Sequence, residues 1–329
     1  MDPAPIAEIA IPDTLDAVRV AGRPVVMRGL VRDWPLVKSA DPLGWLGART
    51  PDPAVRVIRR QGVEGGRFFY HPDDMRRFNF DTGEVAFSHL LEFLRRGAPG
   101  QTVYMGSTEV GELVPGSEAD FALPLVPDGT PARLWLGNRT VVSTHHDHSE
   151  NVACVAQGRR VFTLFPPEQV ANLYPGPIEH TPAGPQLSMV DPDAPDLARF
   201  PRFAEAACHA MRAELGPGDA IYIPPLWWHH VRALTELNAL VNFWWRDRAS
   251  GLRDPMEAFV LSLLSVRELP RAEREAWRAM FDYFVFQTHG EPMAHLPFND
   301  QGVLGDSSPA RAEQIRQFLD GLLGETKEA

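Results

Sequence analysis

The sequence predicts a mainly β fold with helices (α+β), followed by a helical segment. Between residues 101 and 246, short runs of β-branched and aromatic residues are separated by Pro and Gly turns, a pattern typical of a sandwich or a small barrel. After residue 246 the apolar residues recur at helical spacing instead. The alternating strand–helix pattern of a parallel α/β sheet is not found. We therefore divide the chain into a β-rich part, residues 1–247, and a helical part, residues 248–329.

The composition is that of a globular protein and argues against several function classes. Of the 329 residues, 44% are hydrophobic and 23% are charged, so a sizeable buried core is expected. The formal net charge of −11 argues against a general nucleic-acid binder, which needs clustered Lys and Arg. Cys154 and Cys208 form no CxxC pattern, so neither a disulfide framework nor a zinc finger is predicted. We find no signal-peptide pattern and no apolar run of about 18 residues, and we expect a cytoplasmic protein without membrane contact.

The first hundred residues mix short strands and turns with one helix. Leu90, Leu91 and Leu94 share one face of a helix predicted from Ser88 to Arg96. We expect an α/β entry to the β-rich region rather than a separate domain. The predicted strands in this part are residues 24–27, 55–58 and 67–70.

Six further strands are predicted between residues 101 and 246, with one long irregular segment among them. The segment from Pro175 to Pro201 is crowded with Pro, Asp and Gly, so we expect a loop that borders a substrate site. We expect the tryptophans at positions 227, 228, 244 and 245 to pack in the wall of the barrel rather than to bind substrate. The predicted strands cover residues 102–105, 133–136, 140–143, 160–165, 220–223 and 240–245.

Three amphipathic helices are predicted after residue 250. In each of them, apolar residues recur at helical spacing along one face. These faces could cover the barrel or form a dimer interface, and the sequence leaves both open. The apolar residues are Met256, Phe259, Val260, Leu263 and Leu264; then Trp277, Met280, Phe281, Phe284 and Val285; then Ile315, Phe318, Leu319, Leu322 and Leu323.

Two short clusters hold five of the 11 histidines and predict a metal site. Residues two apart in a strand face the same way, so His145 and Asp147 can offer an imidazole and a carboxylate to one ion. His229 follows a second apolar run and can supply the third ligand from a distant strand. Two histidines and one carboxylate, with other coordination positions open, are typical of a non-haem Fe(II) oxygenase. Zinc is the rival metal, because the same ligand types suit it.

The other histidines of the two clusters are harder to assign. In an extended segment, His146 and His148 face away from His145, so we do not expect them in the same coordination sphere. His148 could line the mouth of a substrate site or be a solvated polar residue. His230 is one step out of phase with His229 and is expected to support the ligands or to pack. Only His145, Asp147 and His229 are therefore assigned as metal ligands and catalytic residues.

Around these residues the chain resembles the JmjC, cupin-like branch of the Fe(II)/2-oxoglutarate oxygenases, particularly the asparaginyl hydroxylase of hypoxia-inducible factor and bacterial cupin-like members. The likeness covers roughly residues 20 to 247 and implies a double-stranded β-helix, or jelly roll, as a catalytic domain. Relatives also carry a C-terminal helical segment that is often used for dimerisation, so a homodimer through residues 248–329 stays one of the two alternatives for these helices. The matching blocks are Thr144-His145-His146-Asp147 with Asn151, Gly158 through Phe165-Pro166-Pro167, Gly216-Pro217-Gly218-Asp219 through Val231, and Val241-Asn242-Phe243-Trp244.

The resemblance also implies Fe(II) as cofactor and 2-oxoglutarate as cosubstrate. Arg160 stands where the asparaginyl hydroxylase has Lys, and its guanidinium fork would bind the far carboxylate of 2-oxoglutarate. A surface arginine paired with a glutamate is the alternative for this residue. Tyr104 would reach the same carboxylate, and Asn151 and Asn242 match two asparagines near the cosubstrate.

One departure from the family pattern concerns a hydroxyl donor. The family's threonine three positions before the first ligand is Val142 here, which removes that donor. Ser143 is adjacent but faces the other way in a regular strand. The resemblance therefore implies that 2-oxoglutarate is used, with an altered binding mode.

The implied function is hydroxylation of a protein side chain by a 2-oxoglutarate-dependent dioxygenase. Oxidation of a small molecule, or N-methyl demethylation, is a second enzymatic alternative. A non-catalytic metal-binding cupin is a third, and the presence of all three ligands together with Arg160 and Tyr104 argues against it. The fold alone does not fix the substrate.

Overall fold

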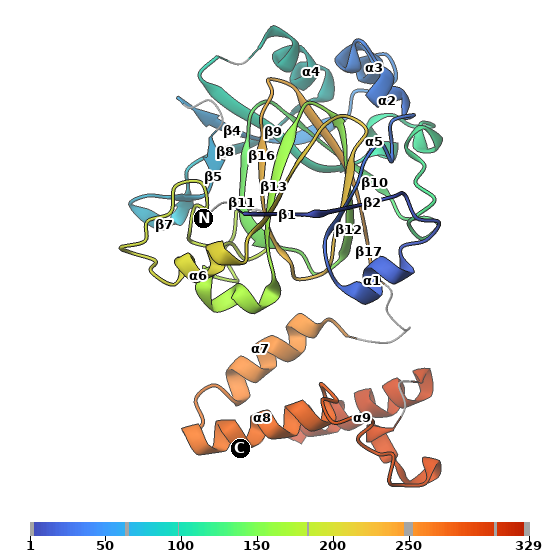
Figure 1. The fold of residues 1–329 in the computed structure, drawn as a ribbon, viewed down its shortest axis with the longest axis vertical. Helices are drawn as coiled ribbons and strands as arrows, with labels where there is room; N and C mark the ends of the chain where they lie inside the picture. The colour runs from blue at the N-terminus through green and yellow to red at the C-terminus, as the bar shows by residue number, and fades with distance from the viewer. Residues whose placement is uncertain are drawn as a thin grey trace. The chain divides into compact units, whose positions relative to one another are not determined.

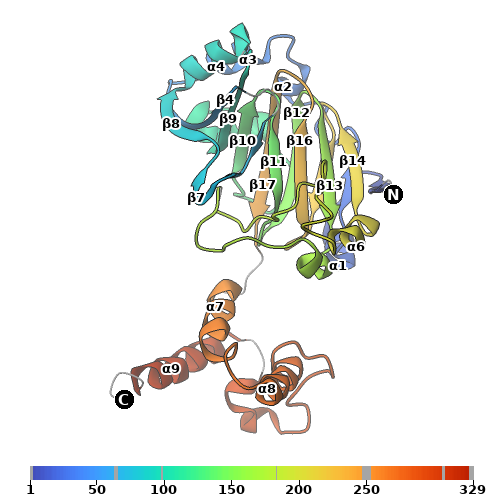
Figure 2. The same cartoon turned by 90° about the vertical axis from the view of Figure 1, so that its left-hand side faces the viewer.

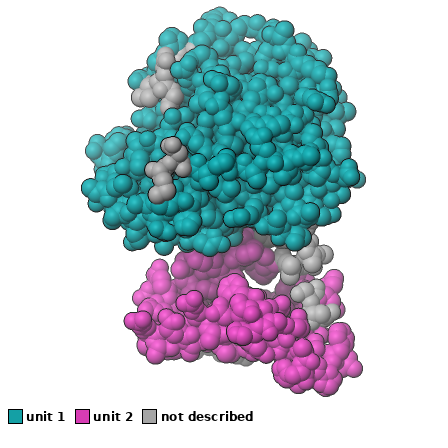
Figure 3. Space-filling view, in the orientation of Figure 1, with its two compact units in different colours: residues 1–246 teal, residues 247–329 magenta. Residues whose placement is uncertain are grey.

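The computed structural model describes residues 3–62, 66–97, 99–182, 184–246, 253–305 and 308–325. The chain divides into two compact units, residues 1–246 and residues 247–329 (Figure 3). The first unit is rich in strands, and the second is helical. Within the described ranges, the helices are all too short or too polar to cross a membrane.

The first unit is built around two β-sheets that lie face to face (Figures 1 and 2). The smaller sheet contains, in spatial order, β1 (Ala4–Pro5), β14 (Met211–Leu215), β13 (Arg160–Phe165), β16 (Trp228–Ala233), β11 (Val141–His146) and β5 (Arg67–Phe68). The larger contains β2 (Ala7–Ile9), β3 (Val25–Met27), β15 (Ala220–Ile223), β12 (Glu150–Gln157), β17 (Asn238–Trp245), β10 (Ala132–Gly137), β9 (Gln101–Glu109), β4 (Ala54–Gln61) and β8 (Asp81–Ala86). A separate hairpin joins β6 (Tyr70–His71) to β7 (Asp74–Phe78).

Neighbouring residues of β12 show how the two faces of the larger sheet are used. Ala153 belongs to the apolar cluster between the sheets, together with Phe162 and Leu164 of β13. Val152 and Cys154 belong to a second cluster, on the outer face of the larger sheet. The arrangement is the jelly roll that the family resemblance implies.

Short helices cover the outer face of the larger sheet. Leu36, Leu46 and Leu90 from three of them pack in the same cluster as Val57 of β4. The helix at Pro42 begins there because the Asp41 carboxylate accepts a hydrogen bond from the backbone N–H of Gly44 at 2.9 Å. The helices of this unit are α1 (Asp16–Ala21), α2 (Pro35–Lys38), α3 (Pro42–Gly47), α4 (Phe87–Arg96), α5 (Val110–Leu113) and α6 (Phe203–Cys208).

The secondary structure confirms most of the predicted elements and adds strands that the sequence pattern misses. Residues 67–70 do not form one strand, because β5 and β6 belong to different sheets. β12 escapes prediction because almost all of it is buried, so that its residues do not alternate between apolar and polar. β14, with the sequence MRAEL, has the composition of a helix. Residues 175–201 are irregular, as expected, apart from isolated bridges.

The second unit consists of three helices joined by turns and short 3-10 segments: α7 (Pro255–Ser265), α8 (Arg271–Phe284) and α9 (Pro309–Glu325). They confirm the three helices predicted from apolar spacing. Among the described side chains of residues 253–321, only Pro292 is buried. The described part of this unit therefore has almost no apolar core of its own. Its exposed apolar side chains include Phe259, Val260, Leu264, Trp277, Met280, Ile315 and Phe318.

Candidate metal centre

Two strands of the smaller sheet bring the predicted ligands together. β11 and β16 are antiparallel, and His145 lies directly opposite His229. The register shifts between Val142 and His145, so that three steps along β11 match two steps along β16. This β-bulge turns His145 to the same side as Val142, and both line one cavity with Asp147.

The side chains of His145, Asp147 and His229 form one compact group of donors. One ligand atom from each lies within 4.8 Å of the other two, and His229 Nε2 is 3.6 Å from Asp147 Oδ2. His145 Nδ1 lies 2.8 Å from the backbone carbonyl oxygen of Ser143. His229 Nδ1 lies 3.0 Å from the backbone carbonyl oxygen of Trp227. If each Nδ1–H donates to its carbonyl, each Nε2 presents a lone pair to the group.

The donor group fits a divalent metal ion. Burial, helped by the nearby His145, lowers the pKa of His229 to about 4, so that His229 is a neutral imidazole at neutral pH. Asp147 Oδ2 is buried without a hydrogen-bond partner in the described structure. A buried carboxylate oxygen of this kind is stabilised by a cation. Two imidazole nitrogens and one carboxylate oxygen suit Fe(II), and they also suit zinc.

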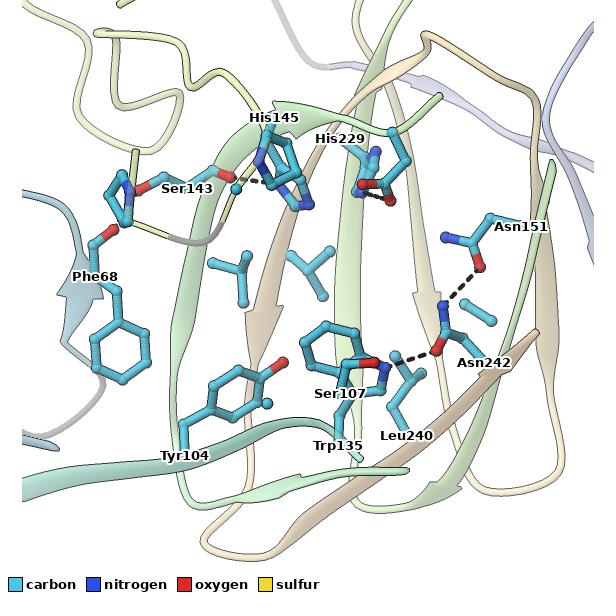
Figure 4. A pocket seen from close by; sticks show the side chains of 18 of the residues that line it. Phe68, Tyr104, Ser107, Trp135, Ser143, His145, Asn151, His229, Leu240 and Asn242 are labelled. Carbon is cyan, nitrogen blue, oxygen red and sulfur yellow. Dashed lines mark hydrogen bonds and ion pairs between the residues drawn. The ribbon is translucent and has the colours of Figure 1, made fainter. Parts of the chain in front are cut away.

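The donor group opens into a cavity of about 570 Å³ that is lined by both sheets. Figure 4 shows His145 and His229 at one end of this cavity, with Tyr104 and Trp135 at the other. The structure places all of the predicted cosubstrate-binding residues on its lining: Tyr104, Asn151, Arg160 and Asn242.

Arg160 is a buried cation that pairs with no carboxylate of the described residues. Arg160 is only 1% exposed to solvent. Its Nε and Nη2 atoms have no hydrogen-bond partner in the described structure. The Tyr104 hydroxyl is the group that interacts with its guanidinium. Burial lowers the pKa of Arg160, while Tyr104 acts in the opposite direction. The alternative of a surface arginine paired with a glutamate is therefore wrong, and the buried guanidinium lies on the lining of the cavity.

Tyr104 is held between aromatic rings on the floor of the cavity. Its ring stacks on Phe68 and Trp135, each with ring centroids 5.9 Å away. Burial raises the pKa of Tyr104 to about 12, although Arg160 lowers it in part. The phenol is therefore protonated at neutral pH, and its hydroxyl can donate to an anion beside Arg160.

The two asparagines form a short hydrogen-bonded chain across neighbouring strands. Asn242 donates from Nδ2 to Oδ1 of Asn151 at 3.3 Å, and Asn242 Oδ1 accepts from Trp135 Nε1 at 2.7 Å (Figure 4). This chain fixes the orientation of the Asn242 amide at the cavity wall.

Ser143 does not replace the hydroxyl that Val142 lacks. Its Oγ donates to the carbonyl of Phe68 at 2.8 Å and accepts from Arg67 Nε at 2.9 Å. Although Ser143 also lines the cavity, its hydroxyl proton is already donated to the carbonyl of Phe68 and is not free for a cosubstrate. Val142 presents only an apolar surface to the cavity.

A model of the cupin-like domain matches residues 13–251. The chain belongs to the cupin-like domain family. The bifunctional peptidase and (3S)-lysyl hydroxylase JMJD7 of Homo sapiens is 31% identical over 68% of this cupin-like chain and 77% of its own length. Lysine-specific demethylase 8 of Xenopus tropicalis is 27% identical over 70% of this chain and 49% of its own length. Lysine-specific demethylase JMJ30 of Arabidopsis thaliana is 30% identical over 70% of this chain and 51% of its own.

These relatives confirm the predicted resemblance to JmjC hydroxylases and demethylases. The cupin-like chain spans about three quarters of the first relative and about half of the other two. Family membership and the His145–Asp147–His229 group together confirm the predicted class, a dioxygenase that uses Fe(II) and 2-oxoglutarate.

The other three histidines of the two clusters in this cupin-like protein lie outside the donor group. His146 contacts Trp228, with ring centroids 4.5 Å apart, and stacks with His148 at 5.3 Å. Both line a smaller hollow of about 310 Å³ that borders Asp147. His230 Nε2 lies 3.0 Å from Asp193 Oδ2, so it supports the long segment between residues 175 and 201.

This segment forms part of the cavity wall and is tied to the smaller sheet. Leu187 forms a β-bridge with His145, and the backbone N–H of Ser188 donates to the carbonyl of Thr144 at 2.8 Å. The carboxylate of Asp193 pairs with His230 and Arg232. The residues of the segment that line the cavity are Thr181, Pro182, Gly184, Pro185 and Leu187.

Asp191, Asp193 and His230 form a second close group of donors. This group already has counter-ions, because Arg232 pairs with Asp193 and Arg67 lies 3.8 Å from Asp191. Two arginines disfavour a metal ion at the same place. We therefore interpret the group as a tie that holds the segment on the sheet.

Several cavity residues are absent from the sequence prediction. Trp244 lines the cavity, whereas the sequence pattern assigned it to packing. It lies two residues after Asn242 on β17, and this spacing could have revealed it, because such residues share a face. Phe68, Phe80 and Trp135 also line the cavity, and isolated aromatic residues in strands give no signal that distinguishes them from core.

Proposed function

We propose that this protein hydroxylates a protein side chain, with 2-oxoglutarate as cosubstrate. The observation that supports this most strongly is the pairing of two features in one cavity. The donor group of His145, Asp147 and His229 lies at one end, and the buried, carboxylate-free Arg160 lines the same space. A metal site with an anion-binding arginine in one cavity is what a chelating dicarboxylate requires.

The roles of the residues follow from their chemistry. His145, Asp147 and His229 would hold Fe(II). When bound, Fe(II) would activate O2 together with the oxidative decarboxylation of 2-oxoglutarate. Arg160 and Tyr104 would bind the far carboxylate of the cosubstrate. Their two donors, one cationic and one neutral, match a carboxylate at neutral pH.

The rest of the lining orients the reactants and keeps water away. Asn242, fixed by Trp135, would present its amide to the cosubstrate. Val142, Ile223, Val231 and Leu240 give the cavity apolar walls. Such walls strengthen the polar contacts inside the site and exclude solvent from the reacting groups. Hydroxylation of a C–H bond does not require a side-chain base, and none is assigned.

A protein substrate is supported by the relatives, which are named for lysyl hydroxylase and lysine demethylase activities. The test is mass spectrometry of a host lysate after incubation with the Fe(II)-loaded enzyme and 2-oxoglutarate. We expect peptides that gain one oxygen atom with the wild type and not with His145→Ala. Loss of a methyl group would indicate demethylation instead. Turnover of 2-oxoglutarate without any modified peptide would contradict a protein substrate and favour a small molecule.

We also propose that the helical unit pairs two copies of the chain. α7 and α8 have no buried residue, although both carry large apolar side chains. A second copy offers the same apolar faces in return, which is how an isologous interface is built.

A further inference from the structure

The charged side chains that line the cavity are mostly cationic. Arg160 is buried, and Arg56 of β4 is an exposed residue on the same lining. Among the described lining residues, Asp147 is the only carboxylate, and we assign it to the metal. A cationic substrate side chain would therefore find no acidic partner among the described residues of this lining other than Asp147.

The strand geometry explains why Arg56 reaches the cavity. Val55 and Val57 belong to the outer apolar cluster, so Arg56 and Ile58 face the opposite side of the sheet. Ile58 lies opposite Tyr104 on β9. Arg56 is two residues from Ile58, which is about 7 Å along a strand. The side chain of Arg56 therefore leaves the strand two residues from Ile58, which lies opposite Tyr104, the hydrogen-bond partner of Arg160.

Arg56 has no ion-pair partner within the described part of the chain, although an acidic residue lies across from it. Glu84 of β8 is opposite Arg56 in the register, but no salt bridge joins them. Arg133 shows the contrast, because it pairs with Glu109 at 2.6 Å and bonds to Ser107 at 3.1 Å. The guanidinium of Arg56 is therefore available to a ligand.

We propose that the substrate is an acidic peptide segment, a proposal that rests on the proposed function. Its target side chain is neutral or acidic, and an aspartate or glutamate beside the target pairs with Arg56. The aromatic ring of Trp244, which lines the cavity and also borders Asp147, can contact the apolar part of the target. This specificity differs from the lysine for which the relatives are named, because lysine would meet Arg56 as a like charge.

The preference must come from short-range contact rather than from long-range attraction. The chain carries a formal net charge of −11, which repels acidic peptides at a distance. Screening at physiological salt limits that repulsion to about 8 Å. The contact between a substrate carboxylate and the Arg56 guanidinium is shorter than this screening length. The preference for acidic peptides is therefore expected to persist at physiological salt.

The test compares Arg56→Glu with a matched control, Arg59→Glu. Both arginines lie on β4 opposite an acidic residue of β8, Glu84 for Arg56 and Asp81 for Arg59. Both reversals therefore create the same like-charge neighbour in the sheet. Only Arg56 lines the cavity, because Arg59 faces the other side of the strand.

Two synthetic peptide libraries serve as probes, identical except that the positions flanking a randomised centre are Asp and Glu in one and Lys in the other. Binding to the metal-loaded protein is measured anaerobically, and hydroxylation is measured by mass spectrometry. We expect the wild type and Arg59→Glu to prefer the acidic library about fivefold, the scale of one partly exposed ion pair. Arg56→Glu should abolish or reverse the preference.

A wild type that prefers the lysine library would overturn the proposal, as would equal shifts in the two variants. Failure of the proposed function looks different. In that case 2-oxoglutarate is not converted to succinate with any library, while anaerobic binding still reports whether Arg56 selects acidic peptides.

Discussion

Arg160 carries the strongest chemical signal at the scale of single residues. A buried guanidinium without a carboxylate is costly, because burial removes its hydration and nothing of opposite charge replaces it. The Tyr104 hydroxyl satisfies only part of its donor capacity. A bound dicarboxylate would remove this cost, so the free protein is destabilised where the cosubstrate is expected to bind.

Substituting Arg160→Met should separate stability from cosubstrate binding. The free energy of unfolding of the ligand-free protein is expected to rise, or to fall by no more than about 1 kcal/mol, because an uncompensated buried charge disappears. The affinity for 2-oxoglutarate should fall by about 2–5 kcal/mol, or at least about thirtyfold in Kd. Urea unfolding and anaerobic calorimetric titration measure the two effects.

Arg67→Met is the matched control. Arg67 is also largely buried, but its guanidinium bonds to Ser143 Oγ and to the carbonyls of Ser188 and Val190. Its loss should destabilise the protein by about 1–3 kcal/mol. Similar destabilisation by both substitutions would mean that Arg160 is an ordinary structural arginine.

At the scale of elements, the tie between residues 191–193 and β16 holds part of the cavity wall. Burial alone would raise the pKa of Asp193, but His230 and Arg232 outweigh this effect and hold the pKa at about 2. Because the folded-state pKa lies below the ordinary value of 3.8, the ionised carboxylate stabilises the fold above about pH 4. This stabilisation is lost as the pH falls from about 4 towards 2.

Asp193→Asn removes that contribution. We expect a loss of about 1–2 kcal/mol in the free energy of unfolding at pH 6, allowing for partial solvent screening. The difference from wild type should shrink to about half by pH 3, since the unfolded carboxyl is then mostly protonated. Chemical unfolding at a series of pH values provides the measurement, and a difference that does not change with pH would contradict this electrostatic origin.

The turn that leads into β13 has a position where only glycine fits. Gly158 has a φ of 78°, and a Cβ at this position would lie 2.4 Å from the carbonyl oxygen of Leu237. Gly158→Ala should cost about 1–2 kcal/mol for the left-handed backbone and about 1–3 kcal/mol more for the clash. Gly116→Ala, at a φ of 80° with open space around the Cβ, should show only the first cost. Thermal or urea unfolding of both variants tests this, and equal costs would contradict the clash.

The residue types and the spacing of the metal ligands could be predicted from the sequence, whereas the geometry of the strand that carries them could not. The ligands His145, Asp147 and His229 were predictable because the chemistry restricts the residue types and strand parity restricts the spacing. The bulge between Val142 and His145 was not, because it depends on pairing with β16, a strand distant in the sequence. The family resemblance assigned Arg160 to the cosubstrate site, but its burial could not be derived from the residue itself, since a charged residue predicts a surface position unless its neighbours in space are known.

At the scale of the whole molecule, the jelly roll and the helical unit differ in how much of their apolar surface they bury. The first unit contains continuous buried clusters, whereas the described part of residues 253–321 buries only Pro292. The positions of the three helices were predictable from their apolar period. Which surface covers their apolar faces was not, because amphipathic spacing gives the face and not its partner.

If two copies pair through these helices, Leu264→Glu should convert dimers into monomers. Leu264 is 82% exposed, so a glutamate there should cost the monomer little. Val20→Glu is the matched control, because Val20 lies on α1 of the first unit and is 90% exposed. Light scattering after size-exclusion chromatography reports the mass, and a wild type that is monomeric at all concentrations would contradict the dimer.

The central claim is that one cavity binds Fe(II) and 2-oxoglutarate together and couples them to oxidation. The most direct measurement is succinate formation from 2-oxoglutarate by anaerobically purified, Fe(II)-loaded protein after oxygen is admitted, with His145→Ala alongside. The account predicts succinate formation that requires the metal and is lost in His145→Ala. Absence of both turnover and saturable 2-oxoglutarate binding in the wild type, with no effect of His145→Ala, would contradict it.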